Sequence, residues 1–180
     1  MDNKKHWENI YQKKEIDGVS WYQKVPLESL QLIKKYSLSN SDKIIDISSN
    51  ALKEVKERLQ NKSLNFIETD ILNFNSNDKY DIWHDRAVFH FITDNKGIEK
   101  YISLCNKYIN NHGILIIGAF AEDGPLKCSG LEIKRYSVDQ ISGLFKETFE
   151  LVESFKMLHK TPFNTEQSFS FCVLRKFSDH

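Results

Sequence analysis

The most conspicuous shortage in this 180-residue sequence is glycine. There are seven glycines, and none lies between Gly18 and Gly97. Phosphate-binding loops need glycine where the backbone turns tightly or approaches the ligand. The sequence contains neither a P-loop nor a GxGxxG motif, so it does not favour an enzyme that binds a nucleotide through one of these loops.

Disulfide motifs, excess charge and long apolar runs are also absent. The three cysteines, Cys105, Cys128 and Cys172, form no CxxC pair, so we expect reduced thiols. Twenty-five basic residues balance 25 acidic ones, which disfavours nucleic acid or an anionic membrane as a partner. No apolar run approaches the roughly 20 residues of a membrane span, and the charged start is unlike a secretory signal. These features predict a cytoplasmic protein, either a monomer or a weak dimer.

The residues that are present predict a folded α/β protein. Forty per cent of the chain is apolar and 12% is aromatic, as in a globular domain with a core. Strand and helix patterns alternate and end in two long strands, which favours a three-layer α/β sheet, mostly parallel, with one antiparallel strand near the C-terminus. The strands are expected at 43–47, 64–72, 80–92, 114–120, 149–158 and 168–177.

Two helices have clear end signals. Ile98, Tyr101 and Cys105 lie on one face of a helix that the turn-forming residues 110–113 should end. Ser137 and Gln140 have the spacing of a capping box and predict the start of a second helix.

Several segments together resemble one enzyme family. They are HWENIYQ and VSWYQ near the N-terminus, ETDIL, DIWHDRAVFHF, NNHGILIIGAF, EDGPLKCSGL and the closing strand pair. In this order they resemble the class I S-adenosylmethionine-dependent methyltransferases, and most closely a subgroup of small bacterial ones. The resemblance implies one methyltransferase-like domain over 1–180, with an N-terminal helical lid (1–36) and a Rossmann-like α/β core (43–180).

The sequence departs from the family at KIIDISSNALKEVKERL, residues 43–59. In the family, the first strand ends in an acid and a glycine-rich loop, and a second strand ends in another acid. Asp46 fits either strand end, as if a block of about 20 residues, including one strand and one helix, were missing. Two explanations remain open: the natural protein contains a segment that these 180 residues lack, or the chain is a remodelled and inactive relative.

The resemblance implies S-adenosyl-L-methionine as co-substrate and no metal. Its expected cofactor-binding residues are Asp46 for the ribose, Asp70 for the adenine with Ile71 packed on the ring, and Ser48, His84 and Trp21. Asp85 and Arg86 form the expected catalytic or acceptor-binding pair, while Asp81, His84 and Asp85 should line the loop near the methionine end.

Less specific roles are also open for these residues. Asp46 could cap the following helix, and Asp85 with Arg86 could be an ion pair that fixes a loop. His84 and His90 lack a third metal ligand at a plausible spacing, which favours satisfied structural histidines. Cys128 is expected to be a packed or loop thiol.

Two functions follow as hypotheses. The first is methyl transfer from S-adenosylmethionine to an unidentified acceptor, either a small molecule or a protein side chain. The second is a catalytically inactive binding or scaffold domain that has lost the cofactor loop. Residues 121–136 and the N-terminal segment are expected to shape the acceptor pocket.

Overall fold

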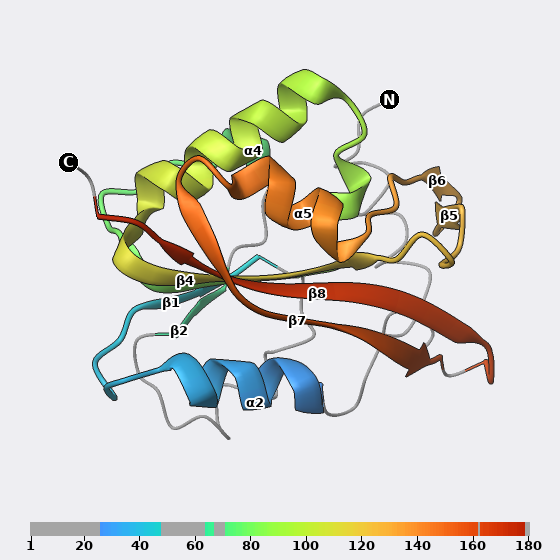
Figure 1. Ribbon diagram of the computed structural model, residues 1–180, viewed down its shortest axis with the longest axis horizontal. Helices are drawn as coiled ribbons and strands as arrows, with labels where there is room; N and C mark the ends of the chain where they lie inside the picture. The colour runs from blue at the N-terminus through green and yellow to red at the C-terminus, as the bar shows by residue number, and fades with distance from the viewer. Residues whose placement is uncertain (1–25, 48–63, 67–70, 162, 179–180) are drawn as a thin grey trace.

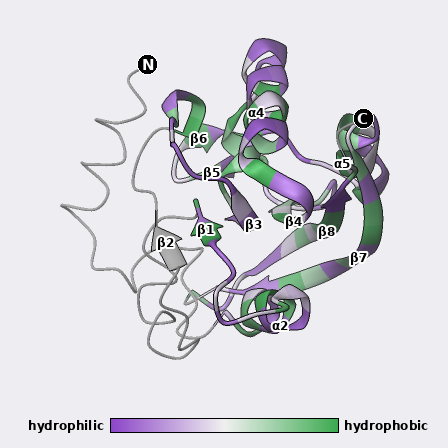
Figure 2. Cartoon of the chain, turned by 90° about the vertical axis from the view of Figure 1, so that its left-hand side faces the viewer, coloured by the Kyte–Doolittle hydropathy of each residue, from purple (hydrophilic) through white to green (hydrophobic). Residues whose placement is uncertain are grey.

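The computed structural model describes residues 26–47, 64–66, 71–161 and 163–178. In this part of the chain a six-stranded sheet lies between α2 on one face and α4 with α5 on the other (Figure 1). Seen from the side, the sheet separates α2 from α4 (Figure 2). The helices are α2 (Leu27–Tyr36), α4 (Asn95–Tyr108) and α5 (Val138–Phe145), with short 3-10 turns η2 (Ile71–Asn73) and η3 (Phe89–Phe91).

The sheet has the strand order β2-β1-β3-β4-β8-β7. Strands β2, β1, β3 and β4 run parallel, and β8 is antiparallel to both of its neighbours, which confirms the predicted architecture. A separate hairpin joins β5 to β6. The strands are β1 (Ile44–Asp46), β2 (Leu64–Phe66), β3 (Tyr80–Arg86), β4 (Ile109–Phe120), β5 (Lys127–Cys128), β6 (Leu131–Glu132), β7 (Phe149–Lys160) and β8 (Glu166–Lys176).

Two hydrophobic clusters hold the layers together. On the side of α4 and α5, the cluster includes Trp83 and Tyr101, whose rings meet edge to face at 6.3 Å. On the side of α2, Ile33 packs with the apolar residues of β4 and β8, including Phe171. A glycine is required where these two strands meet, because a Cβ on Gly118 would lie 2.7 Å from the Phe171 ring.

The helix ends follow local chemistry. The carboxylate of Asp94 accepts a hydrogen bond from the amide of Gly97 at 2.9 Å and caps α4. At the other end, the buried Lys176 ammonium donates to the carbonyls of Asn106 (2.7 Å) and Ile109 (3.3 Å). The predicted capping box of Ser137 is confirmed at the start of α5.

Two predicted boundaries are wrong, and a third is shifted. The helix predicted to stop at 110–113 ends at Tyr108, and β4 runs from Ile109, but its pairing with β3 shifts register across residues 110–113, where His112 has a positive φ of 62°. The strand expected over 80–92 ends at Arg86, since Ala87 has a positive φ of 68° and η3 follows. Residues 71 and 72, expected in a strand, lie in η2.

Other expectations fall outside the described residues: the first 25 residues of the expected N-terminal lid and the helix expected after β1. All three cysteines are described, buried and free, as predicted. No helix in the described ranges is long and apolar enough to cross a membrane.

Candidate functional site

The strand order creates one topological switch point, between β1 and β3. After β1 the chain moves outward to β2, then returns to place β3 on the other side of β1. Ligands of open α/β sheets bind outside the carboxyl ends of the strands at such a point. In the doubly wound strand order 3-2-1-4-5-6, the switch point lies between strands 1 and 4, so the first strand borders it. Strand β1 has this place, so Asp46 ends a strand in the first-strand position.

Asp46 and His84 form a buried pair at this point. They lie opposite each other in the parallel register of β1 and β3, and Nδ1 of His84 is 2.8 Å from Oδ1 of Asp46. Their side chains are 0% and 1% exposed. An ionised carboxylate only accepts hydrogen bonds, so Nδ1 of His84 is the donor of this contact. Among the described residues, Nε2 has no hydrogen-bond partner.

Arg86 is two residues beyond His84, on the same face of β3. Its guanidinium is buried and lies 5.5 Å from the centre of the Phe169 ring. Burial lowers the pKa of Arg86 to about 10, while the charges of Glu28 and Asp46 act in the opposite direction. At neutral pH the side chain is therefore a buried cation.

Asp85 faces the opposite side of the sheet, towards α4. One carboxylate oxygen accepts the hydroxyl of Tyr101 at 2.6 Å, and the other accepts the amides of Val88 (3.0 Å) and Phe89 (3.3 Å). Burial raises the pKa of Asp85 to about 6, although these hydrogen bonds lower it. Asp85 and Arg86, successive residues of β3, therefore lie on opposite faces of the sheet. Their expected role as a catalytic or acceptor-binding pair stays a prediction. Asp85 fixes the loop that follows β3.

The other predicted site residues divide into two groups. Ile71 is buried in η2. Asp81 lies at the amino end of β3, where its carboxylate accepts the amide of Lys43 at 2.8 Å and the side chain of Asn110 at 2.7 Å. The prediction that Asp81 lines the methionine end is therefore wrong, because it lies at the far end of the strand. Ser48, Asp70 and Trp21 lie outside the described residues.

His90, which the sequence analysis considered only as a metal ligand or a structural histidine, is a further candidate. Its ring is fully buried and stacks on Phe120, with the ring centres 4.4 Å apart and the planes 6° apart. Neither ring nitrogen has a hydrogen-bond partner within the described part of the chain. The expectation of a satisfied structural histidine is therefore wrong for His90. Desolvation lowers its pKa to about 3, which keeps the ring neutral.

The loop that follows β4 is attached to the same region. The amide of Lys134 donates to the carbonyl of His90 at 2.8 Å, and the amide of Tyr136 donates to that of Phe120 at 2.8 Å. Residues 121–136 therefore flank the carboxyl ends of β3 and β4, where an acceptor pocket was expected. Cys128, in this loop, is a packed thiol, as predicted.

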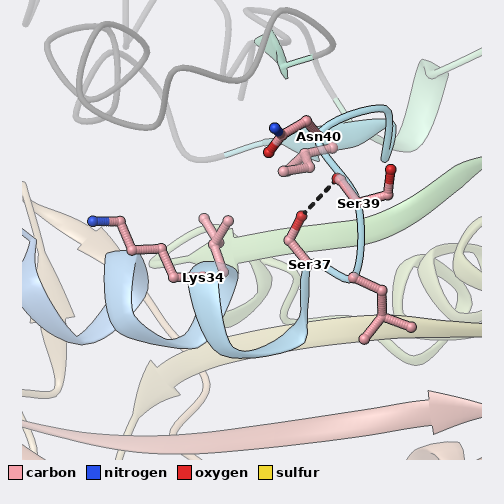
Figure 3. A pocket seen from close by; sticks show the side chains of 7 residues that line it. Lys34, Ser37, Ser39 and Asn40 are labelled. Atoms are coloured by element: carbon pink, nitrogen blue, oxygen red, sulfur yellow. Dashed lines mark hydrogen bonds between the residues drawn. The ribbon is translucent and has the colours of Figure 1, made fainter.

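A pocket of about 320 Å³ lies elsewhere, at the end of α2 (Figure 3). Ile44, the first residue of β1, forms part of its wall, so the pocket lies at the amino ends of the strands and away from the switch point. It is lined by Ile33, Lys34, Ser37, Leu38, Ser39, Asn40 and Ile44. Among the described residues, no cluster of three or more His, Cys, Asp or Glu side chains could hold a metal ion.

Sequence comparison finds one curated relative and no matching family model. The relative is malonyl-[acyl-carrier protein] O-methyltransferase 2 of Ilyobacter polytropus, which is 30% identical over 96 residues. The match covers 53% of this chain and 36% of the relative, so the chain spans about a third of the relative's length.

Solved structures of methyltransferases match nearly the whole chain. The N-methyltransferase NodS of Bradyrhizobium japonicum, in complex with S-adenosyl-L-homocysteine, has a TM-score of 0.63 at 13% identity, covering 95% of this chain and 98% of NodS. A methyltransferase from Anabaena variabilis has a TM-score of 0.71 at 11% identity, covering 98% and 96% of the two chains. Together with the strand order, these matches show that the chain has the Rossmann-like fold of the class I S-adenosylmethionine-dependent methyltransferases.

Proposed function

We propose that the protein transfers a methyl group from S-adenosylmethionine to an acceptor bound at the carboxyl ends of β1, β3 and β4. The observation that carries this proposal is the buried Asp46–His84 pair at the switch point of a methyltransferase fold. Polar atoms in such a place form the usual ligand contacts of an open α/β sheet.

The chemistry requires positioning more than covalent help. The sulfonium of S-adenosylmethionine supplies an activated methyl group. The chain must hold the acceptor in line with it and exclude water. Asp46 and His84 offer a buried polar contact for the cofactor, because Nε2 of His84 has no hydrogen-bond partner among the described residues. Ile71, which directly follows the predicted adenine contact Asp70, offers an apolar surface for the adenine ring.

The acceptor is left open by the relatives, whose names cover different chemistries. The Ilyobacter protein is named for O-methylation of malonyl-acyl carrier protein, and NodS is named an N-methyltransferase. A structure from Burkholderia thailandensis contains 1,6-didemethyltoxoflavin and S-adenosylhomocysteine, with a TM-score of 0.65 at 10% identity. These names support a small-molecule or carrier-bound acceptor as the class to be tested first.

The second candidate is a binding domain without catalysis. Its supporting observation is the absence of glycine between Gly18 and Gly97, the part of the sequence in which the family has its cofactor loop. Such a domain would fold cooperatively and would not respond to the cofactor.

Isothermal titration calorimetry with S-adenosylhomocysteine separates the two candidates. We expect the 180-residue protein to bind with a micromolar dissociation constant and Asp46→Asn to bind at least about tenfold more weakly, since one hydrogen bond to a charged group is worth about 1.5–3 kcal/mol. Asp78→Asn is the matched control, because Asp78 is exposed and pairs with Lys43 at the other end of the sheet. No heat and no thermal shift with the wild-type protein would refute the proposal.

A further inference from the structure

His90 is an unusual residue to bury in an apolar setting. Its ring contacts Phe120 and Phe91, with centres 4.4 and 4.5 Å away, and both ring nitrogens are buried without a hydrogen-bond partner in the described part of the chain. A buried polar atom without a partner destabilises the folded state. A phenylalanine would give the same stacking without this cost. The position therefore calls for an explanation other than packing.

The sheet order places His90 on the β4 side of the switch point. In the proposed function, the cofactor crevice lies between β1 and β3 and contains the buried Asp46–His84 pair. His90 follows β3 and stacks on Phe120, the last residue of β4. Strand β4 lies next to β3 on the side away from β1. A group that binds beside His90 would be next to the cofactor rather than in its place.

Within the described residues, the surroundings of His90 are aromatic and include the buried guanidinium of Arg86. Phe169 lies 4.6 Å from Phe120 and 6.5 Å from His90, measured between ring centres, and the Arg86 guanidinium lies over its ring. Burial keeps His90 neutral, since its pKa falls to about 3. A neutral imidazole offers one donor and one acceptor. A buried guanidinium favours an anion and disfavours a second cation.

We infer that His90, together with Arg86 over the neighbouring Phe169 ring, binds the methyl acceptor and selects an oxygen group, a carboxylate or a hydroxyl, on an apolar body. This inference rests on the proposed methyltransferase function and adds to it the acceptor class and its binding residue. Because His90 has no exposed surface, a neighbouring side chain must move when the acceptor enters. Binding an acceptor supplies the missing hydrogen bonds of the imidazole.

The test uses three probes that share a benzene ring and differ in their polar group: benzoate, phenol and benzylamine. Their binding to the wild-type protein saturated with S-adenosylhomocysteine is measured by calorimetry. We expect benzoate and phenol to bind and benzylamine to bind at least about tenfold more weakly, because it is a cation near Arg86. In His90→Phe, benzoate and phenol should lose at least about tenfold in affinity, the loss of one good hydrogen bond.

Stability gives a second readout that needs no probe. His90→Phe removes two unpartnered nitrogens, so its thermal midpoint should rise by about 2–6 °C. Thr148→Val is the matched control, since its buried hydroxyl also has no partner in the described residues. Thr148 directly precedes β7, whose first residue pairs with Lys176 at the end of β8, away from the carboxyl ends of β3 and β4. Its midpoint should also rise, but it should bind benzoate like the wild type. His90→Gln keeps a donor and an acceptor and should bind the probes better than His90→Phe.

Three results would overturn the inference: a lower midpoint for His90→Phe, unchanged benzoate binding in His90→Phe, or no binding of benzoate and phenol to the loaded wild-type protein. Each leaves the proposed function standing, provided that the wild-type protein binds S-adenosylhomocysteine. A wild-type protein that does not bind S-adenosylhomocysteine refutes the proposed function itself, and this inference with it.

Discussion

Replacement of Asp85 by asparagine should change how the stability of the protein depends on pH. Burial raises the pKa of Asp85 to about 6 in the folded protein, against an ordinary value of 3.8. The folded state therefore binds a proton more tightly than the unfolded state does. This contribution to stability is fully present below the unfolded pKa and is lost as pH rises through the folded pKa.

The magnitude follows from the two pKa values. A difference of about two units corresponds to about 3 kcal/mol, at 1.36 kcal/mol per unit. His90 acts in the opposite direction: its pKa falls to about 3, so its contribution is present above about pH 6.5 and is lost as pH falls. The difference between the wild type and Asp85→Asn isolates the Asp85 contribution, because His90 is present in both.

Urea unfolding at several pH values provides the measurement. The free energy of unfolding of the wild type, minus that of Asp85→Asn, should fall by about 2.4 kcal/mol between about pH 4 and pH 7, since the full contribution of about 3 kcal/mol is present only well below pH 3.8. Asp78→Asn, an exposed carboxylate replaced in the same way, should show a much smaller change. A flat or rising difference would refute the reasoning. It would mean that the donors from Tyr101, Val88 and Phe89 outweigh the cost of burying the charge.

Two further predictions concern packing and helix termination. Gly118→Ala should destabilise the protein by about 1–3 kcal/mol, because the new Cβ would meet the Phe171 ring. Gly143→Ala lies in α5, where nothing is within 4 Å of the new Cβ, so it should stabilise the protein by about 0.5–1 kcal/mol. Urea unfolding measures both variants, and a Gly118→Ala protein more stable than Gly143→Ala would contradict the packing. Lys176→Met should cost about 1–3 kcal/mol, since two carbonyls at the end of α4 lose their donor, and an unchanged urea midpoint would show that water replaces it.

The parts of the fold that the sequence predicted depend on local patterns. The apolar run at 114–120 and the alternation near the C-terminus identified β4 and β8 without reference to any distant residue. Ser137 and Gln140 are three residues apart, so their capping box needs only the first turn of a helix. Such signals lie within one element and survive in the sequence.

The wrong and shifted boundaries have tertiary causes. Residues 110–113 carry turn signals, and β4 passes through them with a shift of register, since Ile109 pairs with Tyr80 and Ile114 pairs with Ile82. The end of β3 at Arg86 depends on Ala87, which has a positive φ and donates its amide to the carbonyl of Gly118 at 2.9 Å. The amides of η3 are held by Asp85, which is itself held by Tyr101.

The candidate site shows the same division. The sequence by itself determined an α/β chain with a buried parallel sheet, a terminal antiparallel strand and acids at strand ends, because these are matters of composition and short-range periodicity. Only the tertiary structure decided that Asp46 lies opposite His84, 38 residues away, that Asp85 and Arg86 face opposite sides of the sheet, and that His90 stacks on Phe120. The register and order of parallel strands are set by packing over the whole sheet, and no segment of the sequence contains them.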